Sequence, residues 1–562
     1  MKNFLTLLLI GLGSLSFAAA ADDVVSHKDW SYRELGLTPI QSGGRIKPLD
    51  SFARETVLFE TGSRSFEGYE PIELMLSWIA NPKYWEDHAF IQIQREDVKR
   101  QLGFNEKQMR FTPREIFENF PLAQYAESLN RKSQGAETQT NPVGNQMNPR
   151  DQELKRLLNR TGLFKSIITG EAWLLIPPGG NSSQPWLSLA APANTGELIK
   201  TQFVGLLKSY LGKDAGEFTS ASRLVRAAVE GEIPGYSEKL KNVVSSELFF
   251  NRLHPFMWAW ILYLVASFAF VFAISEWGGV KSKRLAITIM SAGLGLHVLG
   301  FALRCYIAGR PPVTNMYESI IWVSFGVMLF ASVIYVWTKQ GVILAVSCAL
   351  AALGLIAGDS APAMLDSSIQ PLVPVLRSNY WLTIHVLTIT LGYAAFALTL
   401  GLANLTLFNY LKGSATRKAA IMQLNQLTYR AMQFGVVLLA AGTILGGIWA
   451  DYSWGRFWGW DPKEVWALIA LLAYVVILHA RFTNWIGQFG FAVWTVCSFL
   501  TVLMAWYGVN FVLGVGLHSY GFSAGGRGWV FGFVVLQLIY VGIVAVKEKF
   551  YRRVSAPLAA TS

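Results

Sequence analysis

The chain has 562 residues, of which 52% are hydrophobic and only 15% are charged, and its mean hydropathy is +0.34. This balance is typical of an integral membrane protein and excludes an ordinary soluble enzyme. The formal net charge of +11 would also suit a nucleic-acid-binding protein. In a membrane protein, however, basic residues set the topology, so we expect no nucleic-acid partner.

Residues 1–20 start with a basic residue, continue as an apolar run and end in small residues. This pattern predicts a secretory signal peptide, which is cleaved near Ala20 or Ala21 or kept as an anchor. Residues 21–250 contain most of the acidic residues and no long apolar run, but they show helical spacing of apolar positions. They predict a mostly helical extracytoplasmic domain, in which Thr112 begins a helix as its cap.

Residues 251–550 contain nine apolar stretches of about 20 residues. At 1.5 Å per helical residue this length crosses a hydrocarbon layer of roughly 30 Å. We therefore predict an all-α polytopic membrane protein, with about nine transmembrane helices after the N-terminal domain and a cytoplasmic tail at 551–562. The predicted spans are 257–276, 285–304, 319–337, 342–358, 380–409, 431–450, 464–482, 488–509 and 528–546.

The distribution of basic residues predicts the orientation of these spans. With the N-terminal domain outside, the inner loops and the tail contain more Lys and Arg residues than the outer loops. Lys281, Lys283 and Arg284, for example, all fall in the first inner loop. This bias follows the positive-inside rule, and it places the loop at 451–466 on the outer face.

That loop contains the stretch WGRFWGWDPKEVW, from Trp454 to Trp466. Part of it has an ordinary structural explanation, because Trp is enriched at membrane interfaces. The run from Asp461 through Pro462 to Glu464 also has the pattern of a helix start, with Asp as the cap and Pro in the first position.

Three tryptophans and two glycines in so short a loop exceed what an interface needs. Trp454, Trp458 and Trp460 offer flat aromatic faces, and the glycines between them let a ligand approach the backbone closely. Arg456 could pair with a carboxylate such as a propionate. The loop therefore predicts a large, flat, amphipathic anion as its ligand, and haem fits this description.

Histidine is the usual axial ligand of haem iron, and the chain has seven. His385 lies roughly 8 Å inside the outer end of the fifth span by helical rise, and His518 lies in the last outer loop. Both are at the face of the tryptophan loop, which predicts ligation of one iron from two sides. Because Cys305, Cys348 and Cys497 form no CxxC or CxxCH motif, the haem would be held non-covalently.

Two further histidines fall within predicted spans. His479 lies near the cytoplasmic end of the seventh span, and His297 lies near the middle of the second. Ionisable residues within the bilayer are candidates for function. A depth difference of roughly 12 Å by helical rise argues against both binding one iron. We predict that His479 is a haem ligand and leave the role of His297 open.

These motifs together resemble the CcsA/ResC family of cytochrome c biogenesis proteins (System II), members of the WWD superfamily of haem-handling proteins. The resemblance covers residues 255–550 and includes GRPPVTNMYES at Gly309–Ser319. It implies that His385 and His518 are the outer histidines flanking the WWD loop, and that His479 is the intramembrane haem histidine. In the N-terminal domain the segment GRIKPLDSFARE is similar to longer, fused members of the family.

The resemblance also implies a function. A CcsA-like protein of the bacterial inner membrane would bring haem b to the periplasmic face and present it, reduced, to the CxxCH motif of apocytochrome c. It would work with a CcsB/ResB partner as a cytochrome c synthase (haem lyase). Three alternatives stay open: a respiratory cytochrome b-type subunit, a haem exporter, and a System I WWD protein such as CcmC or CcmF.

Overall fold

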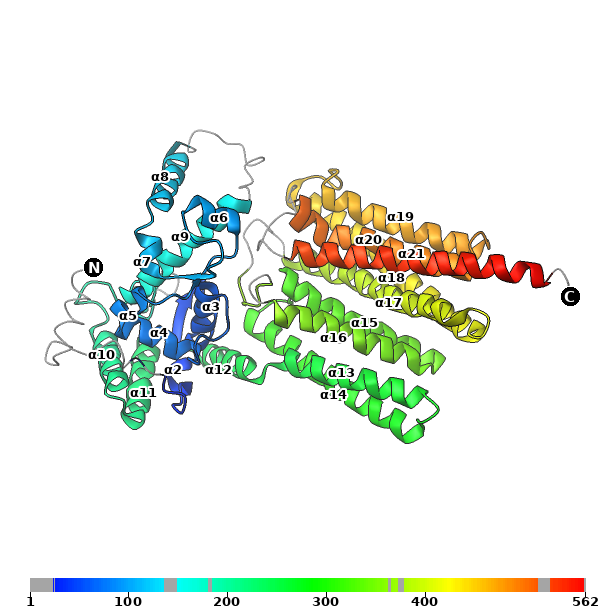
Figure 1. Ribbon diagram of the computed structural model, residues 1–562. Coiled ribbons are helices and arrows are strands. Elements are labelled where there is room, and N and C mark those ends of the chain that lie inside the picture. Colours follow the sequence, from blue (N-terminus) through cyan, green and yellow to red (C-terminus); the bar gives the residue numbers. More distant parts are fainter. Residues whose placement is uncertain are drawn as a thin grey trace. The chain divides into compact units, whose positions relative to one another are not determined.

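The computed structural model describes Val24 and residues 26–135, 149–179, 184–361, 365–371, 379–513 and 526–559. Its contacts divide the chain into two compact units. The N-terminal unit contains the residues up to Leu253 together with Ser368–Pro371, and the membrane unit contains His254–Ser367 and the chain from Leu372 onward. Helices dominate both units (Figure 1).

The N-terminal unit is mostly helical, as predicted. Two short antiparallel ladders interrupt its helices, one pairing β1 (Pro39–Ser42) with β2 (Arg45–Pro48), the other β3 (Ile91–Gln92) with β4 (Arg110–Phe111). The helices are α2 (Arg33–Gly36), α3 (Leu49–Thr61), α4 (Pro71–Ala80), α5 (Pro82–Glu86), α6 (Glu96–Gln101), α7 (Pro113–Phe117), α8 (Phe120–Gly135), α9 (Pro149–Ile168), α10 (Glu197–Leu211), α11 (Ala215–Glu232) and α12 (Glu238–Leu253). Thr112 caps α7 in a capping box, which confirms the predicted helix start.

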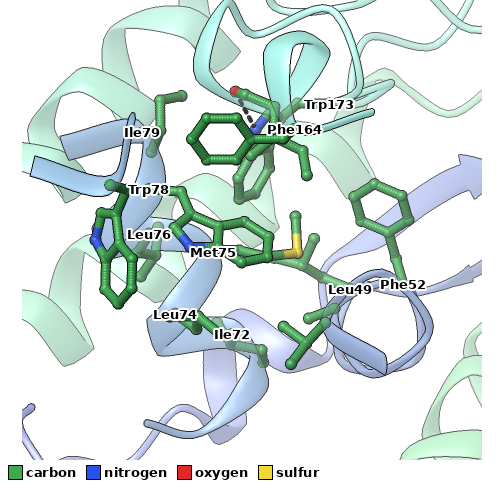
Figure 2. Packing of buried hydrophobic residues seen from close by; sticks show 14 of the residues in the cluster. Leu49, Phe52, Ile72, Leu74, Met75, Leu76, Trp78, Ile79, Phe164 and Trp173 are labelled. Carbon is green, nitrogen blue, oxygen red and sulfur yellow. Dashed lines mark hydrogen bonds between the residues drawn. The ribbon is translucent and has the colours of Figure 1, made fainter. Parts of the chain in front are cut away.

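The core of this unit is built around large aromatic side chains. Figure 2 shows Leu49 and Phe52 of α3 on one side of α4, whose Trp78 is fully buried. Trp78 stacks on Phe90 with ring centroids 5.3 Å apart. The buried indole N–H of Trp173 donates to the carbonyl of Ile167 at 3.1 Å, so this ring carries no unpaired donor into the core.

The segment GRIKPLDSFARE forms β2 and the start of α3. Arg45 makes a bidentate pair with Glu247 of α12, with both N–O distances at 2.7 Å. The hydroxyl of Ser51 donates to the same carboxylate at 2.6 Å. Because bidentate, charge-assisted pairs fix geometry as well as adding stability, this segment ties α12 to the start of α3.

The membrane unit confirms the predicted all-α polytopic architecture. Within the described residues, nine helical segments are long and apolar enough to cross a bilayer, which makes the chain a multi-pass membrane protein. Its helices are α13 (Pro255–Ile274), α14 (Val280–Ala308), α15 (Met316–Thr338), α16 (Gly341–Ser360), α17 (Asn379–Gly413), α18 (Lys418–Trp454), α19 (Pro462–Phe482), α20 (Gln488–Leu503), the π-helix η4 (Met504–Leu513) and α21 (Arg527–Ala559).

Helices α17 and α18 lie side by side and antiparallel in this unit (Figure 1). Glycines allow them to approach closely: a Cβ on Gly442 would lie 2.7 Å from the Cα of Ile389, and one on Gly392 would lie 3.0 Å from the backbone nitrogen of Leu439. Small residues commonly allow such close packing between membrane helices. The pair therefore holds the first turns of α17 firmly against the last turns of α18, where the tryptophan loop begins.

Candidate functional site

A cleft in the membrane unit lies where the ends of several helices meet. It encloses about 1150 Å³ of space, part of which opens to solvent, and its walls are mostly apolar and aromatic. Four parts of the sequence contribute to these walls: the segment before α15, the first turns of α17 with the facing turns of α18, the tryptophan loop with the start of α19, and η4. The cleft thus combines segments nearly 200 residues apart in sequence.

His385 lies in the wall of this cleft, two turns into α17. Its Nδ1 is 2.8 Å from the carbonyl oxygen of Gly442 on α18, and its ring is parallel to that of Trp449, with centroids 6.1 Å apart. Because a carbonyl only accepts hydrogen bonds, Nδ1 must carry the proton and Nε2 the lone pair. This is how proteins orient an imidazole that binds a metal through Nε2.

The three tryptophans of the loop occupy three different environments. Trp458 lines the cleft, whereas Trp454 packs edge-on against Trp449, with ring centroids 4.8 Å apart. Trp460 is perpendicular to Trp458 and is 72% exposed. Gly455 and Trp460 have left-handed backbone conformations, with φ of 71° and 56°. These turns, which only glycine adopts without strain, direct the indoles to different sides.

Asp461 caps α19, and this confirms the predicted helix start. Its carboxylate accepts from the backbone nitrogen of Lys463 at 3.0 Å, while Glu464 accepts from the backbone nitrogens of Asp461 and Gly459 at 3.1 and 2.8 Å. Both acidic side chains therefore hold the loop in shape. Arg456 does not line the cleft, because its guanidinium folds back over Gly459 and occupies the space that a Cβ there would need.

The segment GRPPVTNMYES supplies another wall through Val313, Thr314, Asn315 and Met316. A buried ion-pair triad holds it in place, in which Glu318 accepts from Arg304 at 2.8 Å and from Arg310 at 3.3 Å. The same carboxylate accepts from the backbone and hydroxyl of Thr314, both at 2.9 Å.

The π-helix η4 forms the remaining wall with Trp506, Asn510 and Phe511. The indole N–H of Trp506 donates to the hydroxyl of Ser319 at 3.0 Å, and Asn510 accepts from the ammonium of Lys463 at 3.0 Å. Short π-helical segments are frequent at functional sites. Sequence reasoning had not singled out Lys463, Trp506 or Asn510, because Lys463 appeared to be only part of a helix start and π-helices leave no pattern in hydropathy.

The other predicted histidines lie elsewhere. His518 falls outside the described residues. His479 is exposed in the last turn of α19, where its Nδ1 bonds the carbonyl of Val475 at 2.8 Å, again leaving the lone pair on Nε2. The helices α17 and α19 both start at the cleft. His385 is six residues from the start of α17 and His479 is 17 residues from the start of α19, so at 1.5 Å per residue their depths differ by about 16 Å. One iron cannot bind both.

His297 is fully buried in α14 and does not line the cleft. Its Nδ1 lies 3.2 Å from the hydroxyl of Tyr263, and its ring stacks on Phe301 with centroids 5.2 Å apart. Its described ring contacts are all with Phe and Tyr. These contacts occupy Nδ1 and the faces of the ring, whereas the buried Nε2 has no hydrogen-bond partner among the described residues, so the role of His297 stays open.

Taken together, the cleft offers a ligand a flat indole surface, an oriented imidazole and one ammonium group. A planar macrocycle that carries both a metal and acidic substituents satisfies all three features, because imidazole binds iron and aromatic faces stack on extended π systems. The residues present therefore fit haem.

Comparison with known proteins places the residues of this cleft within a known family. Residues 313–518 match the family described as Cytochrome C assembly protein. The chain is 33% identical over 285 residues to the cytochrome c biogenesis protein CcsA of Prochlorococcus marinus (strain NATL1A), covering 44% of this chain and 89% of the relative. It is 34% identical over 255 residues to CcsA of Chlamydomonas reinhardtii, covering 43% of this chain and 70% of the relative.

A longer relative matches more of the chain. Protein NrfI of Wolinella succinogenes is 29% identical over 500 residues, which is 85% of this chain and 53% of NrfI. A match of that extent includes much of the N-terminal unit as well as the membrane unit, although the chain spans only about half of NrfI. From the matched region, the cleft within it and the identity to the shorter relatives, we conclude that this chain belongs to the CcsA family of cytochrome c biogenesis proteins.

Proposed function

We propose that this chain presents haem at the outer face of the bacterial inner membrane for covalent attachment to apocytochrome c. The observation that carries the proposal is that one cleft is lined both by His385, whose tautomer is set by the carbonyl of Gly442, and by Trp458 of the WWD loop. Membership of the CcsA family supports the proposal, because its relatives are cytochrome c biogenesis proteins.

The ligand in this proposal is haem b, held without a covalent bond. His385 and His518 are its two axial ligands, and Trp458 supports the macrocycle. Ligation by two neutral imidazoles retains iron yet leaves it transferable, because the histidine of a substrate CxxCH motif can replace either one. The cleft then acts by positioning.

The attachment reaction requires little chemistry from this chain. A thioether forms when a cysteine S–H adds across a haem vinyl double bond, so the atoms balance without a leaving group. The cysteines must be reduced, and the vinyl groups must lie beside them. In this proposal the chain orients the haem edge, and no side chain serves as a nucleophile.

His479 marks a second haem position in the proposal. It is exposed on α19, at a depth that excludes sharing the iron of His385. A CcsB/ResB-like partner would supply the opposing ligand, since the described part of this chain brings no second histidine to it. This arrangement gives haem an intramembrane position before it reaches the outer cleft.

Spectroscopy of histidine variants tests the outer site. We expect His385→Gly and His518→Gly, purified in detergent with the partner protein, to lose the spectrum of bis-histidine haem and to regain it when imidazole is added. His88→Gly is the matched control, because His88 lies in the N-terminal unit beside Glu67. If both variants kept the wild-type axial ligation, the proposed site would be wrong.

A gene deletion separates presentation from the rival functions. Loss of all c-type cytochromes with normal b-type cytochromes supports assembly, whereas a respiratory subunit would instead show quinol oxidation in the purified protein. A b-type subunit needs histidine pairs on facing helices, and the described ring contacts of His297 are with Phe and Tyr and include no second histidine.

A further inference from the structure

Lys463 is the one cation among the side chains that line the described cleft. It is the second residue of α19, directly after the Asp461–Pro462 helix start. Most of its neighbours in the wall are aromatic or aliphatic, including Trp458, Phe457 and Phe511. An ammonium group in such surroundings is poorly solvated, and an uncompensated charge of this kind is unfavourable.

The described residues supply this ammonium with a polar neighbour and with the charge of Asp461, two residues earlier in the chain, but with no ion pair at contact distance. Its Nζ donates to the amide oxygen of Asn510 at 3.0 Å, and no carboxylate oxygen within the described ranges lies within 4.0 Å of it. Glu464 also lines the cleft, but its carboxylate accepts from the backbone nitrogens of Gly459 and Asp461 and makes no ion pair with Lys463 within the described ranges. A lysine has three N–H donors, so the cleft presents donors and a positive charge toward its interior.

The sequence suggested Arg456 as the partner of a ligand carboxylate, but the structure places this residue elsewhere. Arg456 folds over Gly459 and is absent from the wall of the cleft. Lys463, in contrast, lines the same cleft as His385 and Trp458. An acidic substituent on a ligand held by these two residues would therefore meet Lys463 and not Arg456.

We propose that Lys463 is the anion anchor of the cleft and receives a propionate carboxylate of the bound porphyrin, with Asn510 as the positioning residue for its ammonium. This inference rests on the proposed haem site and specifies how that site recognises its ligand. A charge-assisted hydrogen bond in a poorly hydrated cleft is stronger than a neutral one. The site accordingly selects porphyrins with a free propionate and orients the macrocycle through it.

The test compares haem with haem dimethyl ester, whose propionates are blocked and carry no charge. Both are titrated into the full-length protein in nanodiscs, and binding is followed by the absorption spectrum. We expect the wild-type protein to bind haem about tenfold to a hundredfold more tightly than the ester. Lys463→Gln should lose this preference while its affinity for the ester stays unchanged, which also shows that the variant is folded.

Asn510→Asp provides a second test that leaves the lysine in place. In this variant a carboxylate replaces the amide oxygen that accepts from Lys463 Nζ. The two side chains then form an ion pair, and the charge of the ammonium is compensated within the protein. We expect the preference for haem over the ester to shrink as it does in Lys463→Gln. Lys418→Gln, an exposed lysine at the start of α18, is the matched control and should keep the full preference.

The outcomes distinguish the two proposals. If the wild-type protein binds haem through His385 but Lys463→Gln and Asn510→Asp discriminate against the ester as strongly as the wild type, the anion anchor is overturned and the haem site stands. If His385→Gly binds both porphyrins with wild-type affinity and spectrum, the haem site itself is overturned, and the anchor with it.

Discussion

The imidazole of His385 packs directly against Gly446 of α18. A Cβ on residue 446 would lie 2.6 Å from the ring carbon Cε1 and 2.9 Å from Nδ1, closer than such contacts occur. Glycine at this position therefore makes room for the ring, and the carbonyl of Gly442 one turn earlier fixes its tautomer. The orientation of this candidate axial ligand therefore depends on Gly446, which itself lines the cleft.

Gly446→Ala should consequently displace the His385 ring. We expect haem affinity to fall about tenfold or more, the usual effect of losing a group that orients a metal ligand, with an altered spectrum that added imidazole restores. Gly295→Ala is the control, because a Cβ there meets nothing within 4 Å. A wild-type spectrum in Gly446→Ala would show that His385 does not bind the iron in the orientation described.

The triad of Arg304, Glu318 and Arg310 leads to a prediction about stability. Arg304 and Glu318 are each 1% exposed, so Glu318→Gln would remove the buried carboxylate that both guanidinium groups contact. We expect it to lower the free energy of unfolding by about 3–5 kcal/mol, measured by thermal or denaturant unfolding in detergent. The exposed Glu276→Gln should have little effect. Equal stabilities of the two variants would contradict this account of the triad.

Much of the fold could be predicted from the sequence because lipid imposes a strong and simple constraint. Every spanning helix must satisfy its own backbone and present apolar side chains over about 20 residues, and hydropathy detects this directly. It does not detect where a helix continues into water. For example, the helix α18 begins at Lys418, about 13 residues before the apolar stretch from which hydropathy predicted it, which begins near 431.

The site was less predictable because loop backbone decides which side chains face inward. Composition identified the tryptophan loop, but the left-handed turns at Gly455 and Trp460 direct only Trp458 into the cleft. The same limit applies to charge. The sequence predicted Arg456 as the anion ligand, but the fold of Arg456 over Gly459 takes it away from the cleft wall, which contains Lys463 instead.

In the N-terminal unit, Glu60 should make stability depend on pH. Its carboxyl group is fully buried, and neither oxygen has a hydrogen-bond partner among the described residues. Burial raises the pKa of Glu60 well above its ordinary value, although nearby Arg160 opposes the shift. The folded chain therefore keeps a proton that the unfolded chain releases above a pKa of about 4.3.

The sign of the effect follows from this proton. Protonated Glu60 contributes fully to the free energy of unfolding below the pKa that it has in the unfolded chain. This contribution is lost as the pH rises toward the pKa of Glu60 in the folded chain, by up to about 1.4 kcal/mol per pH unit. Glu60→Gln should remove this slope, which pulse proteolysis of the N-terminal unit in the full-length protein can measure between pH 5 and 8. The exposed Glu118→Gln serves as the control. An unchanged slope in Glu60→Gln would show that Glu60 is ionised in the folded protein.

Variants of His297 and Tyr263 test whether His297 has a structural role or binds haem iron. If their 3.2 Å contact is the function of His297, then His297→Phe and Tyr263→Phe should each cost about 1–3 kcal/mol of stability, because each leaves one buried polar partner unpaired. The double variant should cost less than the sum of the two, with a coupling of about 0.6–1.7 kcal/mol. The haem spectrum should stay unchanged in all three variants. Loss of part of the haem in His297→Phe, with wild-type haem content in Tyr263→Phe, would instead make His297 a ligand of the intramembrane haem.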